Sequence, residues 1–139
     1  MIILDTNVLS EMIRPQRDKT FLGWILGVDS EEFFTTAVTQ AEILFGLALL
    51  PQSRRRALLA RAVKQMFSED FADRILPFDG ASAEEYAALS AHRRSSGRPI
   101  APFDAQIAAI ARSRNAVLAT RNVKDFHDCE VRLVNPWEP

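Results

Sequence analysis

The first seven residues constrain the fold of this chain most strongly. Residues 2–4 (Ile-Ile-Leu) form an apolar run that ends at Asp5, and Thr6 and Asn7 follow. A short, continuous apolar run with β-branched members is typical of a strand buried on both faces of a parallel sheet. The carboxyl end of such a strand lies at the sheet edge where open α/β folds bind ligands. Asp5 is therefore expected at this edge, as a helix cap or as part of a site.

The rest of the chain alternates between strand-like and helix-like segments. β-branched and aromatic residues predict further strands, over residues 32–38, 75–78, 117–120 and 131–134. Apolar residues at helical spacing, together with capping residues, predict helices, over residues 6–13, 18–28, 39–50, 53–71, 82–97 and 104–114. This alternation predicts an α/β fold in a single domain of residues 1–139, with a mainly parallel sheet of about five strands flanked by helices.

Composition narrows the class of protein. The net charge of -1 shows that the chain is no polycation, so contact with nucleic acid would need a local basic patch, possibly with metal ions. The single cysteine, Cys129, excludes an intrachain disulfide and a cysteine-based zinc site, and it fits a reducing cytoplasm. We expect neither a secretion signal nor a membrane span, because no apolar run has the required length.

Each of three acidic residues has a local explanation when it is considered alone. Glu42 follows Thr39 at the spacing of a capping box, in which the glutamate bonds back to the threonine amide. Asp104 follows Pro102 at the start of another predicted helix, where an acid gains ~0.3–1 kcal/mol from the helix dipole. Asp5 could likewise serve only as a cap.

Considered together, the same three acids predict a metal site. Each lies where a strand or loop leads into a helix, and in a parallel sheet these junctions share one edge. Carboxylates that meet there raise one another's pKa unless a cation neutralises them. Oxygen ligands without cysteine or paired histidine favour Mg2+ or Mn2+ over zinc. Such an ion can activate water for attack on a phosphodiester.

Four segments resemble, in order and spacing, the acidic motifs of PIN-domain nucleases. They are Ile3–Asn7, Ala41–Ile43 with Gly46, Asp104–Ala109 and Leu118–Asn122. The similarity continues through Ile75–Phe78 and the closing Asn135–Trp137. Within the family, the chain looks most similar to the VapC-type toxins of toxin–antitoxin pairs, in particular the FitB-like branch.

The resemblance implies a PIN-like three-layer sandwich with Mg2+-dependent endoribonuclease activity. Asp5 and Asp104 would be the principal metal ligands and Glu42 would complete the acidic cluster. Three further residues would orient these ligands or the substrate: Thr6, Asn7 and Thr120. The implied partners are RNA, a cognate DNA-binding antitoxin that mediates any contact with operator DNA, and a second copy of the chain.

The fourth motif departs from the family pattern. It often contains an acid where this chain has Asn122. An amide oxygen can still bind a metal or hold a water, but the site loses one negative charge. We therefore expect one well-occupied metal site in the free protein, and two tight Mg2+ sites by calorimetry would contradict this. Asp125 could replace the missing acid, although a role in its loop is the simpler interpretation.

Three arginines are candidates for RNA binding. Arg93 and Arg94 precede the Asp104 motif, and Arg121 adjoins the fourth motif. They would contact phosphates beside the acidic cluster, which would otherwise repel RNA. The alternative for each is ordinary surface charge.

Two other functions are compatible with an α/β fold of this kind. One is a non-catalytic module that only docks an antitoxin and acts as a co-repressor. It would need none of the three acids, so their joint presence argues against it. The other is a phospho-accepting, receiver-like domain, which usually has an acid pair near the first strand and a lysine near the last. Asp5 has no acidic neighbour, and no lysine lies between Val131 and Pro139.

Overall fold

The computed structural model describes residues 1–139 and confirms a parallel α/β fold. Its sheet contains β1 (Ile2–Leu4), β2 (Phe33–Thr36), β3 (Ile75–Leu76), β4 (Val117–Ala119) and β5 (Arg132–Val134). The strand order is β3-β2-β1-β4-β5 and every pair is parallel. The first strand is therefore central. It pairs on one side with β2, where Ile2 faces Phe33, and on the other with β4, where Leu4 faces Ala119.

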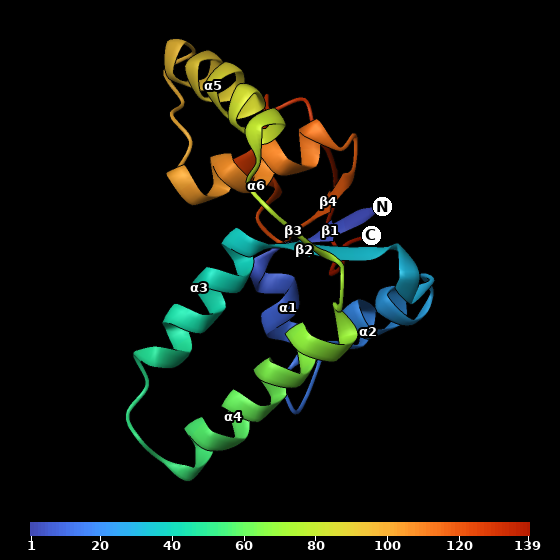
Figure 1. The fold of residues 1–139 in the computed structure, drawn as a ribbon. Helices are drawn as coiled ribbons and strands as arrows, with labels where there is room; N and C mark the ends of the chain where they lie inside the picture. The colour runs from blue at the N-terminus through green and yellow to red at the C-terminus, as the bar shows by residue number, and fades with distance from the viewer.

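Helices cover both faces of the sheet. They are α1 (Thr6–Met12), α2 (Lys19–Leu26), α3 (Ala37–Ala48), α4 (Arg54–Gln65), α5 (Gly80–Ser95) and α6 (Pro102–Ser113). Short helical turns occupy Ser30–Glu32 and Val123–Phe126, and a π-helical turn, Met66–Asp70, continues α4. In Figure 1, α5 and α6 lie on one side of the sheet, while α1, α2 and α4 lie on the other. The predicted three-layer arrangement is confirmed.

Alternate side chains of the central strands enter two separate cores. Ile3 and Leu118 belong to the core shared with α5 and α6, which includes Ile107 and Ile110. Leu4 packs in the opposite core with residues of α1, α2 and α4, among them Phe21. Both central strands are thus buried on both faces, as their continuous apolar sequences predict.

Capping residues set several helix ends. Ser53 caps α4 as predicted, with its side chain accepting from the Arg56 N–H. Helix α5 begins two residues earlier than predicted, because Asp79 rather than Ser82 supplies the cap. Asn115 follows the end of α6 with a φ of 50°, a left-handed conformation that asparagine tolerates.

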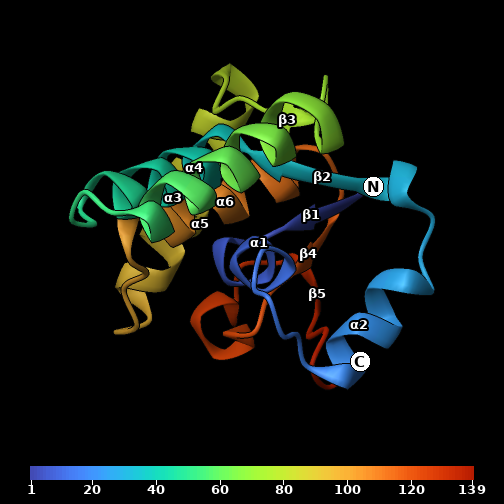
Figure 2. The same cartoon turned by 90° about the horizontal axis from the view of Figure 1, so that it is seen from below.

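Helices α3 and α4 form a hairpin that extends away from the sheet (Figures 1 and 2). Val63 is buried in the core on that side of the sheet, while Leu47 and Leu59 pack against it and are only partly buried. Other apolar residues of the hairpin face outward instead of into a core: Leu58 is 59% exposed and Phe45 is 66% exposed. None of the helices in the structure combines the length and apolar character needed to cross a membrane.

Candidate active site

One pocket at the carboxyl edge of the sheet collects the three predicted acids. Asp5, Glu42 and Asp104 come from the end of β1, from α3 and from α6, and all three line this pocket. The other lining residues are Thr6, Asn7, Ser10, Glu11, Arg14, Arg121, Asn122 and Trp137. The prediction that distant acids meet at one edge is therefore confirmed.

Asp5 is both a helix cap and a part of the pocket. Its Oδ1 accepts from the Thr6 N–H at 2.8 Å, which caps α1. Its Oδ2 accepts from the Thr120 hydroxyl at 2.8 Å and from the Asn7 amide at 3.4 Å. With 4% of its surface exposed, the carboxylate has little freedom to move. Thr120 and Asn7 thus orient Asp5, as expected from the resemblance.

The capping-box explanation of Glu42 is wrong. Helix α3 begins at Ala37, because Thr36 at the end of β2 caps it and accepts from the Thr39 N–H at 3.0 Å. Glu42 consequently lies in the second turn of α3, not at its start. Its carboxylate instead accepts from the Thr6 hydroxyl at 3.0 Å, a contact that directs it toward Asp5 across the pocket.

Asp104 carries the clearest electrostatic signature of the cluster. It is the third residue of α6, where helix N–H groups favour negative charge. Even so, burial and the charges of Asp5, Asp125 and Glu42 raise the pKa of Asp104 to about 6. Burial also raises the pKa of Asp5 and of Glu42. The negative charges of these acids repel one another, and a bound cation would reduce that repulsion.

These raised pKa values make the stability of the metal-free protein depend on pH. A carboxyl group with a higher pKa in the folded state holds its proton more tightly there, so protonation favours folding. The free energy of unfolding should therefore fall as pH rises from about 4 to about 6, the range between the ordinary and the raised pKa of Asp104. Asp104→Asn, which cannot ionise, should lose less stability over that range. Thermal unfolding of both proteins in EDTA tests this, and a Tm difference that is constant with pH would contradict it.

The fourth motif is connected to the first by hydrogen bonds. The Thr120 hydroxyl accepts from the Asn122 N–H at 3.1 Å, and Asn7 Oδ1 accepts from the Arg121 N–H at 3.1 Å. Asn122 itself lines the pocket. Asp125 does not line it, but its charge contributes to the raised pKa of Asp104.

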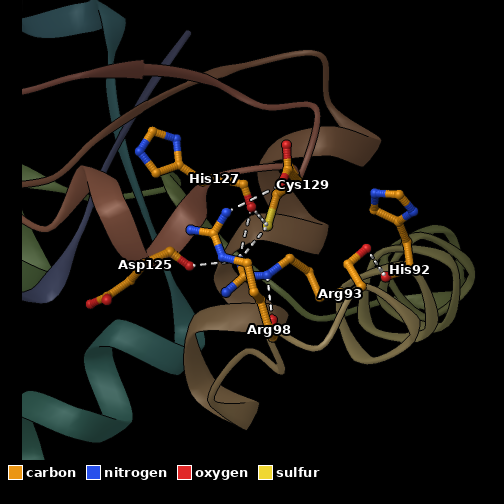
Figure 3. Close-up of polar contacts among 8 residues, drawn as sticks. His92, Arg93, Arg98, Asp125, His127 and Cys129 are labelled. Atoms are coloured by element: carbon orange, nitrogen blue, oxygen red, sulfur yellow. Dashed lines mark hydrogen bonds and ion pairs between the residues drawn. The ribbon is translucent and has the colours of Figure 1, made fainter.

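Arg93 is buried and does not line the pocket, so the prediction that it contacts RNA phosphates is wrong. It is 5% exposed, and its guanidinium points inward from α5 (Figure 3). It donates to the carbonyl oxygens of Arg98 at 2.6 Å, Asp125 at 2.9 Å and His127 at 2.9 Å. Arg93 therefore fastens the segment that carries Asp125 to the end of α5. Its neighbour Arg94 is exposed and does not line the pocket.

Sequence reasoning missed three lining residues on and after α1. Ser10, Glu11 and Arg14 follow Asn7 at spacings of three, four and seven, which place them on one helix face. This spacing is a signal that could have identified them. Glu11 is buried and accepts from the Arg14 guanidinium at 3.1 Å and from the Asp18 N–H at 2.9 Å.

Comparison with known proteins agrees with this geometry. The family model of the PIN domain matches residues 2–130. The chain is 37% identical over 139 residues to the VapC ribonuclease Y4jK of Sinorhizobium fredii, covering 100% of this chain and 99% of that one. It is also 37% identical over 137 residues to the toxin FitB of Neisseria gonorrhoeae, covering 99% of both. The crystal structure of FitAcB from the same bacterium superposes with a TM-score of 0.93, at 37% identity and full coverage of both chains.

The chain therefore belongs to the PIN-domain family. Within that family it groups with the VapC ribonucleases and the toxin FitB, which it matches along its whole length.

Proposed function

We propose that this protein is the toxin of a type II toxin–antitoxin pair and that it hydrolyses RNA phosphodiester bonds as a Mg2+-dependent endoribonuclease. The observation that carries the proposal is the convergence of Asp5, Glu42 and Asp104 on one pocket, where burial and mutual repulsion raise their pKa values. The names of its relatives, a VapC ribonuclease and a toxin, support the same activity.

The donor atoms of the pocket fit a hard divalent ion. All three acids offer oxygen, and no histidine or cysteine lines the pocket. No group of three or more His, Cys, Asp or Glu side chains is assembled tightly enough to enclose a metal alone. Mg2+ needs no such cage, because it keeps several waters and usually takes one or two carboxylates. Asp5 and Asp104 would hold it, with Glu42 beside them, and Mn2+ could substitute.

The bound ion would polarise the phosphate and supply an activated water. The residues of the chain prepare the site for it. Thr120 and Asn7 fix the carboxylate of Asp5, and Thr6 fixes that of Glu42. Such hydrogen bonds to metal ligands typically contribute 10–100-fold in metal affinity or activity. Because Asn122 is neutral, we propose one tight metal site before substrate binds, with Asp125 near enough to assist.

The proposed partner is an antitoxin encoded by an adjacent gene. The matched FitAcB structure supports this assignment, as does a structure of FitAB bound to a DNA fragment. By this proposal the antitoxin carries the contact with operator DNA, the toxin forms a homodimer, and both act in the cytoplasm, where RNA is the substrate. Co-purification with the product of the neighbouring reading frame tests the partner.

The activity is tested by cleavage of RNA in Mg2+ and in EDTA. We expect cleavage in Mg2+, its loss to the background rate in EDTA, and recovery when Mg2+ or Mn2+ is restored in excess. Cleavage that persists in EDTA would contradict the metal mechanism. Absence of cleavage with either metal, combined with tight antitoxin binding, would favour the non-catalytic co-repressor instead.

A further inference from the structure

One cation in the acidic pocket has no polar partner for its charge. Arg121 lines the pocket, yet its guanidinium forms no hydrogen bond and no ion pair with Asp5, Glu42 or Asp104. Only its backbone N–H is engaged, with Asn7 Oδ1. The side chain is therefore available to an anion that enters the pocket.

The position of this guanidinium is fixed by an aromatic ring. Its Cζ lies 4.9 Å from the centre of the Trp137 ring, a cation–π arrangement. Trp137 is itself held by the fully buried Phe21, with ring centres 4.9 Å apart, and by its backbone N–H, which donates to Asn135 Oδ1 at 3.0 Å. A planar cation held in place by stacking retains its N–H groups for bidentate contact with a phosphate.

A second cation lines the same pocket. Arg14 lines it, and its side chain remains 63% exposed although one nitrogen binds Glu11. Along α1, Glu11 is five residues beyond Thr6, a distance of about 7.5 Å at the rise of an α-helix. The pocket thus contains two arginines, Arg14 and Arg121, in addition to its carboxylates.

We propose that Arg121, stacked on Trp137, forms with Arg14 a binding subsite for a backbone phosphate of RNA, separate from the acids that would hold the metal. The inference rests on the proposed function and extends it. The three acids would receive the bond to be cut, while the two arginines would bind a neighbouring phosphate of the same strand. Single-stranded RNA is charged at every nucleotide, so a pocket of carboxylates needs such a cationic contact to retain it.

Binding of labelled decauridylate in EDTA, followed by anisotropy over a range of salt concentrations, tests the subsite without requiring cleavage. Arg121→Gln should weaken binding about tenfold at low salt. It should also reduce the slope of log affinity against log salt by about 0.7, the contribution of one phosphate contact on a single strand. Trp137→Phe should retain most of the affinity, whereas Trp137→Leu should behave like Arg121→Gln. The matched control is Arg132→Gln, which removes the same charge from the start of β5, at the opposite edge of the sheet.

Trp137 also provides a direct spectroscopic signal. The chain has two tryptophans, so Trp24→Phe leaves Trp137 as the only one. Its emission should change on titration with decauridylate, with the same midpoint as the anisotropy, and the change should disappear when Arg121→Gln is added. A purely structural role for the stack would produce no such response.

The outcomes separate this inference from the proposed activity. An unchanged salt slope in Arg121→Gln, or equal losses in Arg121→Gln and Arg132→Gln, would overturn the subsite even if RNA is cleaved in Mg2+. Binding of polyglutamate as tight as that of decauridylate would also overturn the subsite, because it would show no preference for phosphate. Conversely, Arg121-dependent RNA binding without any metal-dependent cleavage would support the subsite and remove the nuclease activity.

Discussion

Asp5→Asn is expected to reduce RNA cleavage about a thousandfold or more, which corresponds to about 4 kcal/mol of activation free energy. The substitution replaces a proposed metal ligand by a neutral amide while keeping its size. The amide oxygen can still cap α1 through the Thr6 N–H, and the Thr120 hydroxyl can turn to accept from the new NH2 group. The loss should therefore lie in the chemistry and not in the fold. Initial cleavage rates in saturating Mg2+ measure it.

The same variant should be more stable than the wild type in EDTA. Burial raises the pKa of Asp5, so its ionised form opposes folding at neutral pH, and an uncharged residue removes that cost. Asp79→Asn is a matched control, because Asp79 also caps a helix but lies outside the pocket. Hydrogen bonds from Ser82 lower the pKa of Asp79, so its replacement should lower stability and leave cleavage unchanged. Equal losses of cleavage in the two variants would show that Asp5 acts only as a cap.

Arg93→Met is expected to lower the free energy of unfolding by roughly 3 kcal/mol or more. The substitution leaves the carbonyl oxygens of Arg98, Asp125 and His127 without their buried donor, and each such orphaned group costs about 1–3 kcal/mol. A domain has only about 5–15 kcal/mol in total, so the variant should unfold at much lower urea. Urea unfolding with the slope held common to all variants gives the difference.

The adjacent arginine supplies the control for this experiment. Arg94→Met removes the same charge from an exposed side chain for which no polar partner exists, so its effect should stay within about 0.5 kcal/mol. Arg93→Lys keeps the charge but cannot reach three carbonyls from one ammonium group, so it should fall between the two. Equal effects of Arg93→Met and Arg94→Met would show that the buried contacts contribute little.

Much of the fold could be predicted from local pattern. The apolar run before Asp5 predicted a strand buried on both faces, and β1 lies at the centre of the sheet. The joint position of Asp5, Glu42 and Asp104 followed from topology, since parallel strands bring their carboxyl ends to one edge. These inferences succeeded because they depend on periodicity and on chain direction, which the sequence records directly.

The surroundings of individual side chains were harder to predict from the sequence than the fold. Thr39 and Glu42 have the spacing of a capping box, but Thr36, three residues before Thr39, already caps the helix. Arg93 and Arg94 are adjacent and identical in type, yet one is buried and the other exposed. Helical periodicity separates neighbouring positions by about 100°, but it does not identify which one meets the loop that returns from β4.

The contact between Arg121 and Trp137 was the least predictable part of the candidate site. Trp137, after the end of β5, packs on Phe21 of α2 and lies 4.9 Å from the Arg121 guanidinium. These contacts bring together Phe21, Arg121 of the fourth motif and Trp137, which are far apart in the sequence. A sequence read in order contains no local sign of them.

The central place of β1 also determines when the proposed active site can form during synthesis. Leu4 pairs with Ala119, and Asp5 accepts a hydrogen bond from Thr120. Residues that are synthesised first therefore need partners that are synthesised more than a hundred residues later. A ribosome that has not yet released Thr120 carries a chain without its sheet partner for β1 and without the group that orients Asp5. Long-range pairings of this kind form late, so the proposed metal site can assemble only after Thr120 has been synthesised.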